Sequence, residues 1–183
     1  MFFDFHTHCF DTPLGEGIVC LPQEVLLSAD GWQPEAGGRY AAGIHPWWTG
    51  QTDFEPVRYL TNLRQLLQFP EMVQLGECGL DRLKGAPLET QLDIFRQQIA
   101  LSEETQKPVT IHCVKAFDLL LAEKKQLRPT QQWTIHGFRG KPALALQLLD
   151  AGFDLSFGPH HNPESWNITP PERRHQETDA QPY

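Results

Sequence analysis

The sequence predicts an α/β fold in which eight parallel strands close into a compact (β/α)8 TIM-type barrel. Two observations support this prediction: short apolar runs recur along the whole chain, and segments with helical periodicity separate several of them. Strands that alternate with helices form parallel sheets, and eight such units favour a closed barrel over an open, doubly wound sheet, which is the structural alternative. The 183 residues allow only about 23 residues for each unit, so we expect the last helix to be absent.

The predicted strands are apolar runs of four to eight residues without clean alternation, as expected for strands that are covered on both faces. They cover residues 2–6, 17–21, 40–45, 73–78, 109–113, 133–136, 153–157 and, more weakly, 175–179. No linker, internal repeat or low-complexity tract interrupts the series. Residues 1–183 are therefore predicted to form one domain.

Helical periodicity fills several of the intervals between these strands. The helix predicted over residues 89–107 ends before Pro108, which is a normal helix exit. A second helix starts at Pro142 and ends at Gly152, with proline near the first turn and glycine just past the end. Further helices are predicted over residues 54–67 and, from its N-cap signal, after Asn162.

Composition bounds the class of protein. Apolar residues make up 40% of the chain and charged residues 21%, which is typical of a globular protein and excludes a disordered chain or a membrane protein. The chain has no apolar run of the length that spans a membrane, and its first residues carry no basic region typical of a signal peptide. The four cysteines show no CxxC spacing, as expected for reduced thiols. We therefore expect a cytoplasmic protein.

Two histidines stand at the end of the first predicted strand, in the sequence Asp4-Phe5-His6-Thr7-His8. Residues two apart on a strand point to the same face, so His6 and His8 are placed to bind one metal ion. Two histidines brought together by chance are the alternative. The position favours metal binding, because the active sites of barrel enzymes lie at the C-terminal ends of the strands.

Imidazole or carboxylate groups also end four further strand-like runs, at Glu77, His112, His136 and Asp179. Taken singly, each is more often a polar residue at the edge of a loop. In a barrel, however, all five strand ends meet on one face. Four histidines with two carboxylates are a ligand set that suits zinc, manganese or iron.

The order of these motifs resembles that of the TatD-related metal-dependent hydrolases (the TatD DNase family), a branch of the amidohydrolase-type barrels. The matching stretches are residues 3–8, 43–47, 76–81, 108–112, 135–140 and 177–180. Each motif is weak alone, but six in the family's order are specific, and they cover essentially the whole chain.

The resemblance implies a centre with two divalent metal ions, which we expect to be zinc, manganese or magnesium. Carried over to this sequence, the resemblance gives His6 and His8 as ligands of the first ion and His112 and His136 as ligands of the second. It gives Glu77 as the carboxylate that bridges the two ions. Asp179 is then a further ligand of the first ion and also takes the proton of the attacking water. Two neighbouring cations lower the pKa of a shared water and stabilise charge on a phosphoryl oxygen. A carboxylate suits the bridge because each of its oxygens can face one ion.

Four residues are candidates for substrate binding. The resemblance places His45 beside the site in contact with substrate, whereas a hydrogen bond that caps its strand end is the alternative. Lys115, Arg82 and Arg139 each follow a strand-end motif, where they can bind a substrate phosphate or stand as solvated residues of a loop.

These observations predict a metal-dependent hydrolase that cleaves phosphodiester bonds in the manner of a deoxyribonuclease. The net charge of −8 argues against binding nucleic acid by general attraction, although metal ions and a local basic patch can still hold phosphate. The expected partner is DNA or a small phosphoester, with no membrane and no obligate protein partner. Hydrolysis of a small amide, ester or phosphoester is one alternative, and a metal-binding protein without turnover is another. The short stretch after Asp179 makes the placement of this residue the critical test.

Overall fold

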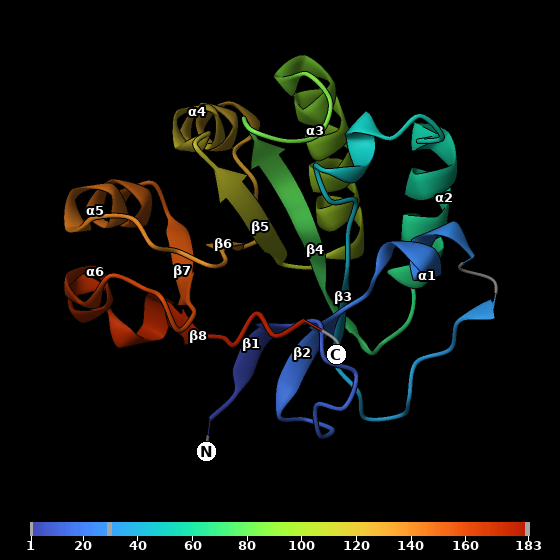
Figure 1. Cartoon of the computed structure of the whole chain (residues 1–183), viewed down its shortest axis with the longest axis horizontal. Helices are drawn as coiled ribbons and strands as arrows, with labels where there is room; N and C mark the ends of the chain where they lie inside the picture. Colours follow the sequence, from blue (N-terminus) through green and yellow to red (C-terminus); the bar gives the residue numbers. More distant parts are fainter. Residues whose placement is uncertain (1, 29–30, 182–183) are drawn as a thin grey trace.

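The computed structural model describes residues 2–28 and 31–181 and contains one eight-stranded parallel sheet (Figure 1). The strands follow one another around the sheet in chain order: β1 Asp4–Thr7, β2 Gly17–Cys20, β3 Tyr40–Ala42, β4 Met72–Asp81, β5 Val109–Val114, β6 Trp133–Ile135, β7 Phe153–Phe157 and β8 Arg174–Gln176. This order confirms the predicted barrel. The open, doubly wound alternative is wrong, because its strand order would reverse at a switch point.

Helices stand around the outside of the sheet (Figure 1). They are α1 Gln23–Leu27, α2 Pro56–Leu66, α3 Leu88–Thr105, α4 Phe117–Leu127, α5 Pro142–Asp150 and α6 Pro163–Ile168, with short 3-10 turns η2 Trp48–Gly50 and η3 Pro171–Arg173. Helices α2, α3, α5 and α6 match the predicted segments, whereas α1 and α4 lie outside them. The described residues contain no helix between β1 and β2 or after β8. None of the described helices is long and apolar enough to cross a membrane.

The core lies between the sheet and these helices. Phe95 of α3 packs edge to face on Trp133 of β6, with ring centroids 5.3 Å apart, and Trp133 meets Phe153 of β7 at 5.8 Å. All three side chains are fully buried. Aromatic pairs of this geometry are favourable beyond the area that they bury, and they tie three neighbouring parts of the barrel wall together.

Three strands end three residues away from the predicted position, and the ends of the other strands agree to within one residue. Strand β3 stops at Ala42, so His45 lies in the loop that follows it, and β8 stops at Gln176, so Asp179 lies beyond its strand. Strand β4 continues to Asp81, four residues past Glu77, because its last residues keep pairing with β5 as far as Val114. The site residues therefore come partly from strands and partly from the loops just after them.

The segment after β8 links the two ends of the barrel. The backbone N–H of Asp179 donates to the carbonyl of His6 at 3.1 Å, and the N–H of His8 donates to the carbonyl of Ala180 at 2.8 Å. In Figure 1 the described segment after β8 runs past the ends of β1 and β2. These bonds bring the last predicted site residue beside the first two.

Strands β4 and β5 lie very close together at Gly79. This glycine has a φ of +147°, and a Cβ atom on it would lie 2.0 Å from the carbonyl oxygen of His112. Only glycine fits such an approach. The contact sets the distance between the strand that carries Glu77 and the strand that carries His112.

Candidate metal centre

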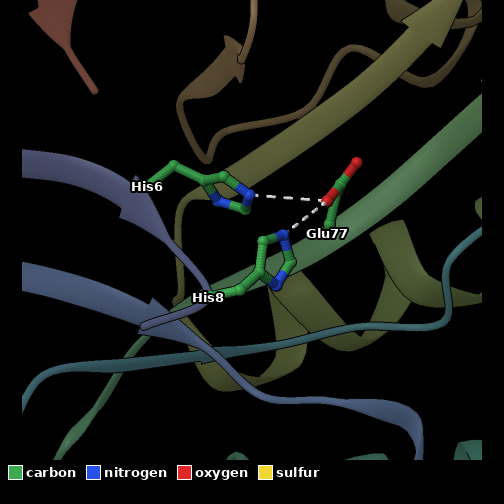
Figure 2. A group of neighbouring side chains, drawn as sticks. All are labelled: His6, His8 and Glu77. Carbon is green, nitrogen blue, oxygen red and sulfur yellow. Dashed lines mark ion pairs between the residues drawn. The ribbon is translucent and has the colours of Figure 1, made fainter. Parts of the chain in front are cut away.

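The two histidines of the first strand face the same carboxylate (Figure 2). His6 lies within β1 and is fully buried, whereas His8 follows the strand and is partly exposed. Their Nε2 atoms lie 3.4 Å and 3.7 Å from Oε2 of Glu77. Both rings therefore direct Nε2 to the same oxygen of Glu77.

The other oxygen of Glu77 faces a second group of imidazoles. Oε1 lies 2.7 Å from Nδ1 of His112, 2.8 Å from Nε2 of His136 and 3.1 Å from Nε2 of His45. His112 comes from β5, His136 directly follows β6, and His45 follows β3. Glu77, on β4, thus stands between two separate sets of histidines, with one oxygen turned to each set.

Asp179 joins the site from the segment after β8. Its Oδ1 lies 3.7 Å from Nε2 of His8 and 4.0 Å from Nε2 of His6, and about a third of its side chain is exposed. Its backbone has a φ of +50° and is held by the hydrogen bond to His6. The structure therefore brings Asp179 beside the first pair of histidines.

The residues present fit a metal centre. Both ring nitrogens of His6 are buried and have no hydrogen-bond partner among the described residues, which leaves a nitrogen lone pair free in the site. Ligand atoms on one tetrahedral zinc ion lie about 3.4 Å apart, close to the spacing of the Nε2 atoms of His6 and His8 from Glu77. Three groups of side chains bring their ligand atoms within 4.8 Å of one another: His6, His8 and Glu77; His6, His136 and Asp179; and His45, Glu77 and His112.

Glu77 and His136 stabilise each other's charged forms. Burial raises the pKa of Glu77, but the charge of His136 and the hydrogen bonds from His112, His136 and His45 outweigh burial and hold this pKa well below its usual range. Burial lowers the pKa of His136, but Glu77 and the buried carboxylate of Glu177 hold it well above its usual value. Glu77 is therefore an anion at neutral pH, as a metal bridge must be.

Two cavities lie against this centre, and both are lined by His112, His136 and Asp179. The first has a volume of about 370 Å³, and Trp47 and Trp48 form part of its wall. The second has a volume of about 390 Å³ and is lined by Lys115 and Arg139. The first cavity thus has an aromatic wall, and the second is lined by two basic residues.

The remaining candidates for substrate binding differ in their surroundings. Arg82 lines neither cavity: its guanidinium donates to Asp118 at 2.8 Å and to the carbonyl of Lys115 at 2.9 Å. His45 lines the first cavity, and its Nδ1 accepts the backbone N–H of Trp47 at 3.1 Å. Both interpretations of His45 therefore have a contact to support them.

Sequence reasoning missed three buried carboxylates around the site. Asp81 lies 3.1 Å from Nε2 of His112, Glu177 lies 3.4 Å from Nδ1 of His136, and Asp4 holds Thr178, the neighbour of Asp179. A signal was present for Asp81: it stands four residues after Glu77 on one strand, and residues an even number apart share a face. Asp4 and Glu177 each stand two residues from a predicted ligand.

The chain is similar to known proteins over most of its length. Residues 19–183 match the family model described as TatD related DNase. The chain is 33% identical over 120 residues to the 3'-5' ssDNA/RNA exonuclease TatD of Erwinia billingiae, a match that covers 62% of this chain and 43% of that protein. It is 32% identical over 142 residues to the human 3'-5' RNA nuclease TATDN2, covering 76% of this chain and 17% of that protein.

Among solved structures, the fold is similar to that of YJJV, a TatD homologue from Escherichia coli K12. The TM-score is 0.78 at 26% identity, and the match covers 97% of this chain and 78% of that chain. This chain therefore spans most of the length of that homologue but less than half the length of the Erwinia billingiae exonuclease.

Proposed function

Because the chain belongs to the family of TatD-related DNases, we propose that it is a divalent-metal-dependent hydrolase that cleaves phosphodiester bonds, with DNA or a small phosphoester as its substrate. The names of its relatives include nucleases of single-stranded DNA and of RNA. The match to the TatD-related DNase model spans residues 19–183, which include Glu77, His112, His136 and Asp179, and this supports the same class of substrate here.

One observation carries the proposal: the two oxygens of Glu77 face two different sets of imidazoles. Oε2 faces His6 and His8, and Oε1 faces His112 and His136. A carboxylate divided in this way is suited to bridge two cations. We propose His6 and His8 as ligands of the first ion, His112 and His136 as ligands of the second, and Glu77 as the bridge.

Imidazole-rich ligand sets favour zinc, and manganese and magnesium are the alternatives. When bound, such ions supply positive charge that acidifies a neighbouring water and stabilises a phosphoryl group. Asp179 is proposed as a further ligand of the first ion and as the acceptor of the proton from the attacking water. Its partial exposure beside both cavities supports this role, because a proton acceptor must reach the water.

We propose that Lys115 and Arg139 bind the substrate phosphate from the second cavity, and that His45 contacts substrate in the first. Arg82 is a weaker candidate, since it would have to leave Asp118 to bind phosphate.

We also propose a cytoplasmic location, which the four free cysteines support. The proposal requires no protein partner.

Turnover measured with and without a chelator tests this function. Purified protein would be assayed on single-stranded DNA, on a generic phosphodiester, and on a small ester and amide. His136→Ala should abolish turnover and reduce bound metal. His161→Ala serves as the matched control, because His161 bonds to the carbonyl of Gly158 and lines neither cavity beside the centre. Turnover of the ester or amide alone would support the first alternative, and metal binding without turnover would support the second.

A further inference from the structure

We propose that Asp81 is a positioning residue that orients the imidazole of His112, so that this ring presents Nδ1, and not Nε2, to the metal centre. The inference rests on the proposed function, since it concerns how a ligand of that centre is held. It assigns a role to a buried carboxylate that makes no contact with Glu77 among the hydrogen bonds and ion pairs of the described residues.

The geometry of His112 is the first support. Its two ring nitrogens face two different carboxylates: Nδ1 lies 2.7 Å from Oε1 of Glu77, and Nε2 lies 3.1 Å from Oδ2 of Asp81. A metal-bound imidazole usually donates its second N–H to a carboxylate or carbonyl, which sets the ring orientation and the protonated nitrogen. Asp81 stands where such an acceptor is needed.

Asp81 is itself held from both sides. Its Oδ1 accepts the backbone N–H groups of Leu83 at 2.7 Å and Lys84 at 3.1 Å. Its Oδ2 accepts the indole N–H of Trp47 at 2.6 Å, besides facing His112. A carboxylate with this many donors has no freedom to swing into the centre as a ligand, but it is fixed as an acceptor.

The backbone around Asp81 is also fixed. Gln91 of α3 accepts the N–H of Asp81 at 2.8 Å and donates to its carbonyl at 2.9 Å. Gln91 is buried and also donates to the carbonyl of Ala86 at 2.7 Å. Helix α3 therefore fixes the position of the Asp81 backbone at the end of β4. This position lies beside the end of β5, which carries His112.

His136 provides an internal comparison. It turns Nε2, not Nδ1, to Oε1 of Glu77, and its Nδ1 lies 3.4 Å from Oε1 of Glu177. The two histidines proposed for the second ion thus face Glu77 with different nitrogens, and each has its own carboxylate behind it. Removing Asp81 should affect His112 and leave the orientation of His136 unchanged.

Zinc affinity tests this assignment without reference to turnover. Metal-free wild type, Asp81→Ala and Asp81→Asn would be titrated with zinc against a coloured chelator. We expect Asp81→Ala to weaken the binding of one of two zinc ions about 10- to 100-fold. Asp81→Asn, which keeps an oxygen but loses the charge, should lie between. If Asp81→Ala does not fold, the zinc affinity of Asp81→Asn compared with that of wild type still tests the inference.

A second readout separates positioning from a purely structural role. In the zinc-loaded wild type, the Nε2–H of His112 should give a downfield proton signal that exchanges slowly with solvent. This signal should be lost in Asp81→Ala, whereas the signals of the other histidines remain. Asp154→Ala is the matched control, because Asp154 also pairs with a histidine, His175 at 3.4 Å, but lies outside the site. It should lower stability and leave zinc affinity unchanged.

The possible failures can be told apart. Wild-type zinc affinity and an unchanged His112 signal in Asp81→Ala would overturn this inference and leave the proposed function intact. A wild-type protein that binds no divalent metal would overturn the proposed function and this inference with it.

Discussion

Asp4 accepts two hydrogen bonds from Thr178, one from its backbone N–H at 2.9 Å and one from its hydroxyl at 2.5 Å. Asp4 is a buried residue of β1, and Thr178 directly precedes Asp179. The first strand of the barrel therefore holds the last residue of the site. This pair fixes the backbone directly before Asp179 against β1.

Thr178→Val tests the contribution of this pair. Valine has the shape of threonine but cannot donate, so one oxygen of a buried carboxylate loses its partner. We expect the metal-free protein to lose about 1–3 kcal/mol of stability in urea unfolding. We also expect reduced turnover, because Asp179 is less firmly placed. Thr105→Val is the control: among the described residues, the hydroxyl of Thr105 bonds only to a carbonyl of its own helix, so its effect should be smaller. Equal losses in both variants would contradict the prediction.

Asp179→Asn tests the proposed proton acceptor. The amide is nearly the same size as the carboxylate, so the fold and the metal site proposed at His112 and His136 should persist. Turnover at saturating metal should fall by about 10²- to 10⁴-fold, because an amide cannot take the proton. Equal and measurable rates of both proteins would mean that Asp179 is not the base.

Gly79→Ala tests the close approach of β4 to β5. The added Cβ would lie 2.0 Å from the carbonyl oxygen of His112 at a φ that disfavours alanine. We expect a loss of stability of several kcal/mol, roughly 3 or more, in chemical unfolding, together with weaker metal binding. Gly31→Ala is the matched control, because no atom of the described residues lies within 4 Å of a Cβ added there. Its stability should be unchanged or slightly higher.

Lys115→Ala tests the basic side of the centre. If Lys115 contacts a substrate phosphate, the variant should bind single-stranded DNA more weakly, and the slope of log affinity against log salt should fall by about one unit. Lys125→Ala is the control, since Lys125 is exposed on α4 and lines neither cavity beside the centre. An unchanged slope in Lys115→Ala would make Lys115 a solvated lysine.

Because of Lys124, the stability of the folded protein should change with pH in the alkaline range. Burial lowers the pKa of its ammonium from 10.5 to about 8, and its Nζ lies over the rings of Phe153 and Trp133 at 4.5 Å and 5.0 Å. Between these two pKa values the unfolded chain binds a proton that the folded protein does not bind. The free energy of unfolding therefore rises as the pH increases from about 8 to 10.5. It is lowest below about pH 8, where the buried ammonium is charged in the folded protein.

Lys124→Met should remove this dependence. Denaturant unfolding at pH 7 and near pH 10 should show a gain in stability for the variant at pH 7 and a smaller difference from wild type at the higher pH. A difference between the two proteins that stays the same at both pH values would contradict the lowered pKa.

Much of the fold could be predicted from the sequence alone, because its signals are local. Apolar runs, helical periods and the stops at Pro108 and Gly152 lie within single elements, and eight strands that alternate mainly with helices imply a parallel barrel. The convergence of the site follows from the same fact, since the C-terminal ends of parallel strands meet on one face. His6 and His8 follow from the alternation of one strand. That residues 1–183 form one domain stays a prediction.

Only the tertiary structure decided how these residues meet. The division of Glu77 between two sets of imidazoles depends on the register of β4 against its neighbours, which no local period encodes. Asp4 reaches Thr178 only because the barrel brings its two ends together across 174 residues of sequence. The pairing of Arg82 with Asp118 likewise depends on how a loop packs against a helix. A sequence pattern specifies the face on which a side chain lies, whereas distances between side chains on different strands are set by register, strand length and closure of the sheet.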